Sequence, residues 1–331
     1  MKKRSVFALL TASALGLSLF SGCARPGSEN NDPASNGAEG EPIKIIIGHT
    51  DSSQRSTHKW SVWLGEYLEE KAPGRFVVEV HSDGSLGDSP DMVATVAGDE
   101  ASCVDLPYLY PSYEDWVEGT FENGGLELFN EAIEPAGYYC LGMYYNGMRQ
   151  VISRNKTYHN AADLKGQKIR IAQNELNVEM WKDMGGNPSP MAWGEVVSSL
   201  STGAIDGLDH SLGVFNDFNL HEIAPYITLT NHASSPFPVI CSLEWLNSLS
   251  QEDQELVKEG VRLMCEQQRE EERANEIEYI ERFKAEGATV EELTDEEVAA
   301  FTEAVQPVYD LWREKVGDDV IDAWLATVPQ H

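Results

Sequence analysis

The residues able to do chemistry are widely spaced along this chain. Its five cysteines and eight histidines form no Cys-x-x-Cys pair and no histidine pair beside a carboxylate at metal-ligand spacing. The nucleophile elbow, the zinc-protease motif, the phosphate-binding loop and the dinucleotide fingerprint are all absent from the sequence. We therefore expect no cofactor and no metal, and a surface-exposed enzyme is kept only as an alternative.

Cys23 is the cysteine with the most informative surroundings. A basic stretch, 2–4, precedes an apolar run, 6–20, and the small residues Ser21 and Gly22 lead into Cys23. Such a run is too short to span a membrane as a stable helix and is typical of a secretory signal, so we predict a signal peptide over 1–22. The cysteine position resembles the site cut by the lipoprotein signal peptidase, which implies a lipid on Cys23. An ordinary signal peptide with an incidental cysteine is the alternative.

Residues 23–42 are small and polar, with no apolar side chain larger than that of alanine before Pro42. A segment of this composition cannot bury enough surface to offset its ordering entropy, which predicts a flexible tether. A lipid followed by a tether predicts a protein exported to the outer face of the cytoplasmic membrane, at the cell surface or in the periplasm.

The chain is strongly acidic, with a formal net charge of −31. Electrostatic repulsion argues against nucleic acid and anionic lipid surfaces as partners. We interpret the charge as favouring solubility, and an anionic ligand would need a local basic site.

The body of the chain alternates strands and helices. Apolar runs over 43–48 and 75–81 predict strands, and the apolar residues of 60–68 recur at helical spacing between them. The order strand, helix, strand predicts an α/β fold with a partly parallel sheet. Ser89 and Pro90 suit the start of a further helix. Beyond it we predict strands over 166–172, 204–208 and 238–243 and helices over 175–184 and 193–202.

The C-terminal third differs from the rest. Residues 250–286 contain no proline and many Glu, Gln and Arg residues, which predicts one very long helix or two joined end to end. Thr294 and Glu297 form a capping box that predicts a last helix extending toward Lys315.

Several motifs stand in an order that resembles the solute-binding proteins of TRAP transporters, the tripartite ATP-independent periplasmic family. The resemblance covers nearly all of the body and is strongest over 163–171 and 190–196. Its other landmarks are His58 and Trp60, the Leu-Gly turn at 85–88, the Leu-Pro element at 105–108, and 200–207.

The resemblance implies a two-lobed, periplasmic-binding-protein-like clamp of the α/β class, with mixed sheets and a long connecting helix. We expect lobe I to comprise 43–146 and 236–275, and lobe II to comprise 147–235 and 276–331. Hinge closure between such lobes removes water from a captured ligand.

The resemblance also implies a carboxylate site. Arg170 occupies the place of the family's carboxylate anchor, and a guanidinium offers two parallel N–H donors that match a carboxylate. Arg149 matches a second basic position, Trp193 an aromatic that packs on the ligand, and Gln173 is a weaker candidate. A structural ion pair is the alternative role for the arginines.

Two departures from the family pattern stand out. His210 takes the place of an asparagine, which would make binding depend on pH near the histidine pKa, unless it is an ordinary surface histidine. The stretch 99–106 is shorter than usual, so we expect a central strand of lobe I to be absent or replaced.

The expected function is capture of a small organic acid for the membrane subunits of a TRAP transporter, with the membrane contacted through the lipid anchor. A degenerate binding protein with a sensor or surface-interaction role and the binding protein of an ATP-driven importer are alternatives. The remaining cysteines can be read either as disulfide partners or as buried thiols: Cys103, Cys140, Cys241 and Cys265.

Overall fold

The computed structural model describes residues 41–86 and 98–330. The predicted signal peptide, Cys23, almost all of the predicted tether and the start of the helix predicted at Ser89 lie outside these residues. Among the described residues, no helix is both long enough and apolar enough to cross a membrane.

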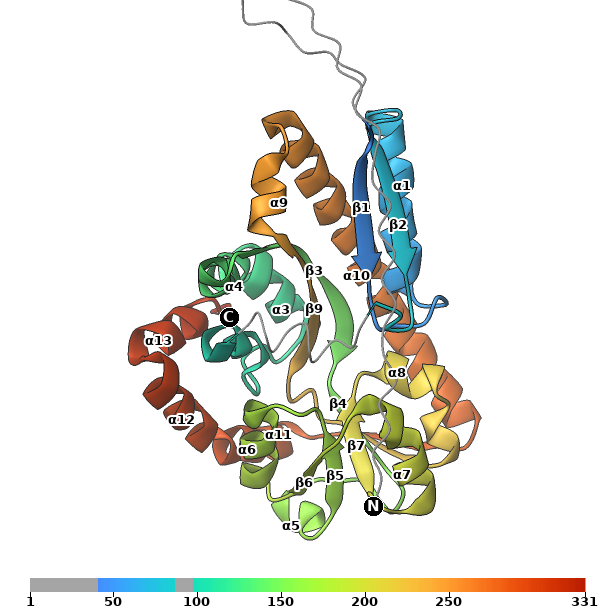
Figure 1. Ribbon diagram of the computed structural model, residues 1–331. Helices are drawn as coiled ribbons and strands as arrows, with labels where there is room; N and C mark the ends of the chain where they lie inside the picture. The colour runs from blue at the N-terminus through green and yellow to red at the C-terminus, as the bar shows by residue number, and fades with distance from the viewer. Residues whose placement is uncertain (1–40, 87–97, 331) are drawn as a thin grey trace, which may run out of the picture. The chain divides into compact units, whose positions relative to one another are not determined.

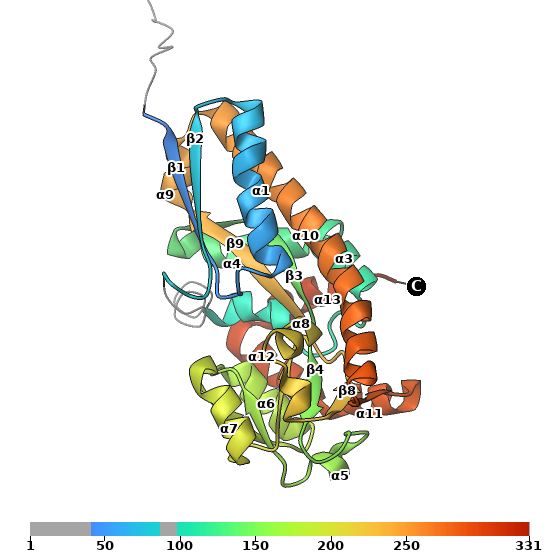
Figure 2. The same ribbon diagram turned by 90° about the vertical axis from the view of Figure 1, so that its right-hand side faces the viewer.

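The first strand–helix–strand unit is confirmed. Strand β1 (Ile43–Gly48) pairs in parallel with β2 (Phe76–His81), and α1 (Ser56–Lys71) connects them. Leu64 and Leu68 of α1 are buried with Phe76 in a core shared with the long helix α10 (Gln251–Ala285). The two helices lie side by side in Figures 1 and 2.

The long C-terminal segment forms one continuous helix and not two joined end to end, the other arrangement that the sequence allowed. Helix α10 has 35 residues, and its N-cap is Ser250, whose side chain accepts a hydrogen bond from the backbone N–H of Asp253. It packs on β3 (Tyr138–Met148), which pairs with β9 (Ser234–Ser242) as an antiparallel two-stranded sheet. The strand predicted over 238–243 corresponds to β9, which begins four residues earlier, at Ser234.

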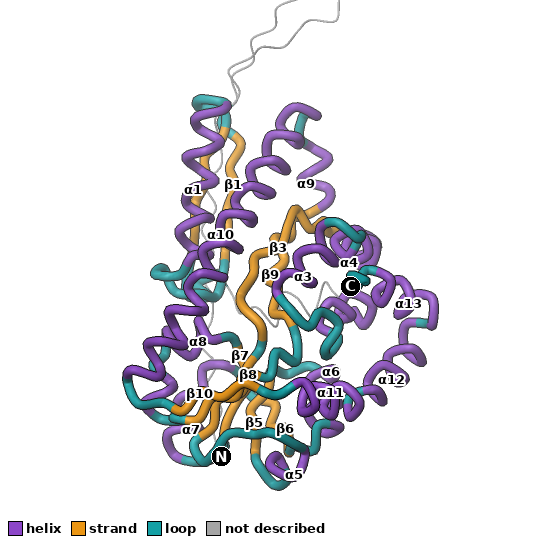
Figure 3. The backbone as a smooth tube through the Cα atoms, turned by 180° about the vertical axis from the view of Figure 1, so that it is seen from behind, coloured by secondary structure: helices purple, strands orange, loops and turns teal. Residues whose placement is uncertain are grey.

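The second sheet has six strands in the order β10-β8-β4-β7-β5-β6. It is mixed, because β5 runs parallel to β6 and β7 whereas β4 runs antiparallel to β7 and β8. Figure 3 shows its strands gathered beyond the end of the β3–β9 pair. Its members are β4 (Gln150–Ser153), β5 (Lys168–Ile171), β6 (Asn187–Pro190), β7 (Gly207–His210), β8 (Tyr226–Leu229) and β10 (Thr289–Glu292).

Short helices flank this sheet. They are α5 (Ala161–Leu164), α6 (Glu175–Asp183), the 3-10 turn η3 (Trp193–Glu195), α7 (Val196–Thr202), α8 (Leu212–Asp217) and η4 (Leu220–Glu222). The helix predicted over 193–202 thus begins as a 3-10 turn and ends, as predicted, at Gly203, which has φ +77°.

The strand predicted over 204–208 is displaced, and β7 begins only at Gly207. The reason is local hydrogen bonding. The N–H of Ala204 donates to Ser199 O, so the chain at Ala204 folds back on α7 and does not join the sheet. Asp206 is held by a bond from its N–H to Lys168 O at 2.8 Å.

No strand forms between residues 98 and 137. Residues 98–101 are helical, and η1 (Ser102–Asp105), α3 (Tyr113–Phe121), α4 (Gly125–Ile133) and η2 (Glu134–Ala136) follow. In the described part of the chain, the β1–β2 pair and the β3–β9 pair are separate sheets. This agrees with the expectation that a strand is missing or replaced here.

The prediction of one last helix extending from Thr294 toward Lys315 is wrong, because three separate helices follow Thr294. The capping box of Thr294 and Glu297 is present at the start of α11 (Asp295–Ala304). Pro307 lies in the first turn of α12 (Gln306–Val316), and Gly317, with φ +100°, separates α12 from α13 (Asp318–Ala326). Helix α12 packs against α6, and α13 packs against α4 (Figure 1). A further short helix, α9 (Leu243–Ser248), precedes α10.

The four described cysteines are free thiols. Cys103, Cys140 and Cys265 are buried, and Cys241 is partly exposed. Burial raises the pKa of the Cys140 thiol to about 12, which leaves it protonated and unreactive at neutral pH.

Candidate functional site

Three strands bring the candidate residues to one edge of the six-stranded sheet. Because β5 runs parallel to β6 and β7, the carboxyl ends of these strands meet at that edge. Arg170 lies near the end of β5, and His210 is the last residue of β7. Ligands of open α/β sheets commonly bind outside the carboxyl ends of the strands.

Arg170 is held firmly at this edge. Its side chain is buried, with 5% of the residue exposed, and its Nε and Nη2 groups donate to the carbonyl oxygen of Met191 at 3.0 and 2.7 Å. The guanidinium carbon lies 5.3 Å from the centre of the Trp193 ring, within the range of a cation–π interaction. These contacts fix the orientation of the guanidinium.

An aromatic cluster adjoins Arg170. The half-buried Trp193 ring meets His210 and Phe218 edge-on, with centroid distances of 5.4 and 5.1 Å. Phe218 is 45% exposed. Sequence reasoning missed Phe218, because nothing distinguishes it within the polar stretch that follows α8.

His210 is a neutral hydrogen-bond donor. Its Nδ1 accepts a bond from the backbone N–H of Ser211 at 2.9 Å, which assigns the ring proton to Nε2. Burial foremost, and then Arg149 and Arg170, hold the pKa of His210 well below its ordinary value. The expectation that its protonation would tune binding near the ordinary pKa is therefore corrected. Nε2 meets no hydrogen-bond acceptor among residues 41–86 and 98–330.

Arg149 is close by but already paired. It precedes β4, and its Nε and Nη2 donate to Asp209 Oδ2 and Asp209 O at 2.9 and 3.2 Å. Asp209 is fully buried and also lies 3.1 Å from His232 Nε2. Burial acts to raise the pKa of Asp209, but Arg149 and His232 outweigh it and lower the pKa overall. Arg149 thus contributes positive potential to the site while its donors are engaged by an internal carboxylate.

Gln173 lies apart from this cluster. It is exposed in the loop between β5 and α6, and its side chain makes no hydrogen bond within the described residues. The structure therefore brings Arg170, Trp193 and His210 together, places Arg149 behind them, and leaves Gln173 at the surface.

Sequence reasoning also missed Arg55, which precedes α1. Its side chain is 1% exposed and forms an ion pair with Glu272 at 2.9 Å. It lies close enough to His210 to contribute to the lowering of that histidine's pKa. Three arginines, 55, 149 and 170, therefore act to lower the pKa of His210 in an otherwise acidic protein. No sequence motif marks Arg55, which stands in an ordinary polar turn.

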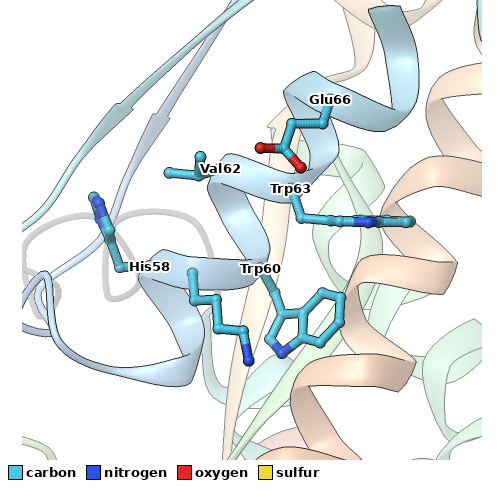
Figure 4. Close-up of a pocket in the computed structure, with 6 residues that line it drawn as sticks. His58, Trp60, Val62, Trp63 and Glu66 are labelled. Carbon is cyan, nitrogen blue, oxygen red and sulfur yellow. The ribbon is translucent and has the colours of Figure 1, made fainter. Parts of the chain in front are cut away.

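A shallow hollow of about 380 Å³ lies on α1, away from these residues. Figure 4 shows His58 and Val62 on one side of the helix and Trp60 and Trp63 on the other, so the side chains do not converge. Trp60 is already engaged, since its Nε1 donates to Glu271 at 2.8 Å. We assign the candidate site to the edge of the six-stranded sheet and not to this hollow.

Comparison with known proteins gives a consistent result. Residues 47–315 match the family model of bacterial extracellular solute-binding proteins, family 7. A solute-binding protein of Roseobacter denitrificans is 29% identical over 253 residues, covering 71% of this chain and 77% of the relative. The ectoine-binding periplasmic protein TeaA of Halomonas elongata is 28% identical over 273 residues, covering 76% and 79%.

Solved structures show the same fold. A TRAP periplasmic solute-binding protein of Sulfitobacter with bound β-D-galacturonate has 25% identity and a TM-score of 0.78, covering 85% of this chain and 99% of that one. The ectoine-binding protein of the Halomonas elongata TRAP transporter has 25% identity and a TM-score of 0.79, covering 86% and 98%. The expected two-lobed α/β clamp with mixed sheets and a long helix is thus confirmed, and the chain belongs to the family-7 extracellular solute-binding proteins of the TRAP transporter type.

Proposed function

We propose that this protein captures a small carboxylate at the Arg170 edge of the six-stranded sheet and delivers it to the membrane subunits of a TRAP transporter. The observation that carries the proposal is the placement of a buried guanidinium, an aromatic ring and a neutral histidine donor at one edge. Such a set recognises a carboxylate through charge and hydrogen bonds while the ring packs on the body of the molecule.

The proposal gives each residue of the site a role. Arg170 is the carboxylate anchor, and the Nε2–H of His210 donates to a ligand oxygen. Trp193 and Phe218 pack on the ligand, and Arg149 acts through its positive potential. Gln173 contacts a ligand only if its loop moves inward.

Relatives support this class of ligand. Besides the galacturonate-bound and ectoine-binding proteins, they include a sialic acid-binding periplasmic protein of Vibrio cholerae at 26% identity. A 2,3-diketo-L-gulonate-binding periplasmic protein of Escherichia coli is also 26% identical. All four ligands carry a carboxylate on a polar body. We therefore propose a sugar acid or a compact zwitterionic acid for this chain.

The location and tethering of the protein are part of the proposal. Three of the relatives are named periplasmic proteins, which supports export. The lipid on Cys23, the signal peptide over 1–22 and the tether over 23–42 depend on the sequence pattern. A tether would keep the two-lobed body near its transporter and raise its local concentration there.

A binding protein that has lost transport, with a sensor or surface-interaction role, is the second candidate. It is favoured by the helical residues 98–105, in the region where the sequence predicted that the family's strand is absent or replaced. We propose no catalytic activity, in agreement with relatives that are named as binding proteins.

A thermal-shift panel tests the proposal. The protein without its signal peptide is melted with β-D-galacturonate, ectoine, sialic acid or 2,3-diketo-L-gulonate, beside Arg170→Ala and the control Arg262→Ala at an exposed position of α10. A probe at about a hundred times its Kd adds about 2.7 kcal/mol, or roughly 5–10 °C in Tm.

We expect at least one acid to stabilise the wild type and Arg262→Ala but not Arg170→Ala. Equal stabilisation of Arg170→Ala would refute the assigned anchor. No stabilisation of the folded wild type by any acid would favour the second candidate.

A further inference from the structure

Arg55 is the most deeply buried cation outside the Arg170 edge in the described part of the chain. It is the N-cap residue of α1, and its side chain is 1% exposed. Its Nη2 donates to Asn146 Oδ1 at 2.7 Å and to Glu272 Oε1 at 2.9 Å. One guanidinium nitrogen therefore joins the start of α1 to the end of β3 and to α10.

The other two nitrogens of Arg55 are buried without a hydrogen-bond acceptor among the described residues. The nearest carboxylate oxygens are Asp217 Oδ2, 3.7 Å from Nη1, and Asp51 Oδ2, 3.9 Å from Nε. These distances suit an ion pair but exceed those of a hydrogen bond. A shift of α8 toward α1 by less than an ångström would complete a bond between Nη1 and Asp217.

The charges around Arg55 do not balance. One guanidinium faces the carboxylates of Asp51 from the loop after β1, Asp217 from α8 and Glu272 from α10. Burial foremost, with repulsion from Asp51 and Glu272, raises the pKa of Asp217 to about 6, although Arg55 acts to lower it. Keeping Asp217 ionised at neutral pH therefore costs folding stability.

This cluster connects to the candidate site through α8. Ser211 Oγ lies 3.5 Å from the Asn146 oxygen that binds Arg55, and the N–H of Ser211 fixes the ring of His210. The backbone at Gly213 lies against the guanidinium, because a Cβ there would come within 2.2 Å of Arg55 Nη1. Arg55 thus touches the segment that presents His210.

We propose that Arg55 and Asp217 form a positioning pair that docks α8 onto the start of α1 and completes its hydrogen bond when a carboxylate is captured. The inference rests on the proposed function, because the captured acid is the ligand of the Arg170 edge. Arg55 belongs to predicted lobe I and Asp217 to predicted lobe II. Closure of the lobes and formation of the Arg55–Asp217 hydrogen bond therefore occur together.

An ionised Asp217 lowers the stability of the fold, which supports a role for this carboxylate beyond folding. A carboxylate retained only for stability would have a lowered pKa, whereas that of Asp217 is raised. Removing its charge is therefore expected to stabilise the ligand-free protein while weakening capture. These opposite effects distinguish a positioning pair from a structural ion pair.

The test compares Asp217→Asn with Asp217→Glu, which keeps the carboxylate, and with Asp183→Asn, a charge-matched control at the end of α6. Titration calorimetry with β-D-galacturonate and with ectoine gives the affinity, and amide hydrogen exchange of the ligand-saturated proteins gives the protection of α8. We expect Asp217→Asn to bind about ten-fold more weakly, with faster exchange in α8 and an unchanged or higher Tm. Asp217→Glu and Asp183→Asn should both bind like the wild type.

The pH profile provides a second readout. As the pH falls from about 7 to about 5, Asp217 gains a proton and wild-type affinity should decline more steeply than that of Asp217→Asn, in which Asp105, with a pKa raised by burial to about 6, still titrates. Wild-type affinity and α8 exchange in Asp217→Asn would overturn the inference. Failure of the wild type itself to bind either probe would instead refute the proposed function, on which the inference rests.

Discussion

At the scale of single residues, His210 combines a half-buried ring with a fixed tautomer. Its proton is held on Nε2 because Nδ1 accepts from Ser211, and its lowered pKa keeps the ring neutral. We predict that His210→Phe weakens binding of the stabilising acid by roughly ten-fold to a hundred-fold, since a hydrogen bond to a charged group contributes about 1.5–3 kcal/mol. His210→Asn should keep most of the affinity, because its amide also donates.

Calorimetry between about pH 6 and about pH 8 measures the affinity of the wild type, His210→Phe and His210→Asn. The affinity of Asp217→Asn should change less over this range than that of the wild type, because Asp105, with a pKa raised by burial to about 6, remains. A loss of affinity that follows protonation of the wild-type ring would contradict the neutral-donor role.

Asp209 carries a prediction about stability. Its folded-state pKa is lowered, so its contribution is present above the unfolded pKa of about 3.9 and is lost as the pH falls below that value. Asp209→Asn leaves the Arg149 guanidinium buried without its partner and should lower the free energy of unfolding by about 3 kcal/mol at neutral pH.

Urea unfolding at several pH values measures this difference. Below about pH 3.9 the gap between wild type and Asp209→Asn should shrink by about 1.4 kcal/mol per pH unit. A gap that is independent of pH would show that the Asp209 charge is not the source of stability.

The sequence predicted part of the site. Arg170, Trp193 and His210 stand in recognisable motifs, and the structure brings them together. The engagement of Arg149 with Asp209 depends on β4 pairing with β7, a long-range contact that no local pattern encodes. Arg55 was missed for the same reason, because its partner Glu272 lies 217 residues further along the chain.

At the scale of elements, the close pairing of β7 with β4 depends on Gly207. A Cβ at Gly207 would lie 2.5 Å from the carbonyl oxygen of Ile152 on β4, so a side chain there pushes the two strands apart. We predict that Gly207→Ala lowers the free energy of unfolding by about 1–3 kcal/mol and weakens ligand binding by moving His210.

Gly194→Ala is the matched control. It lies in η3 beside Trp193, and a Cβ there meets no atom within 4 Å. Its stability should stay within about 0.5 kcal/mol of the wild type in the same unfolding experiment. Equal effects of the two substitutions would argue against tight β4–β7 packing as the cause.

Strong local signals predicted the elements best. The long helix and the capping box of α11 follow from composition and capping, and both are present. The four-residue strands β4, β6, β8 and β10 were missed, because they are too short for a periodic pattern. The eleven-residue β3 was missed as well. Two prolines in β6 disguised that strand further, although an edge strand tolerates them.

At the scale of the whole molecule, the net charge of −31 opposes the approach of an anion. Salt screens this repulsion, with a Debye length of about 10 Å at about 0.1 M. We predict that association of β-D-galacturonate becomes faster as NaCl is raised from about 10 to about 150 mM. Ectoine has no net charge, so its association rate should change little.

Stopped-flow tryptophan fluorescence measures both rates. An association rate for galacturonate that falls with added salt would mean that the arginines around His210 dominate the field seen by the ligand. The two-lobed fold itself was predictable from the order of motifs, whereas this balance between global repulsion and local attraction depends on how the folded chain places its charges.

The central claim is that a carboxylate binds between Arg170 and His210. Nuclear magnetic resonance of protein labelled with ¹⁵N-histidine observes the His210 ring directly, with its signals assigned by their loss in His210→Asn. With whichever of the four acids stabilises the protein, we predict a shift of the His210 Nε2–H signal while the ring stays neutral and keeps its tautomer. Saturation with a stabilising acid that leaves this signal unmoved would contradict the assignment of the site.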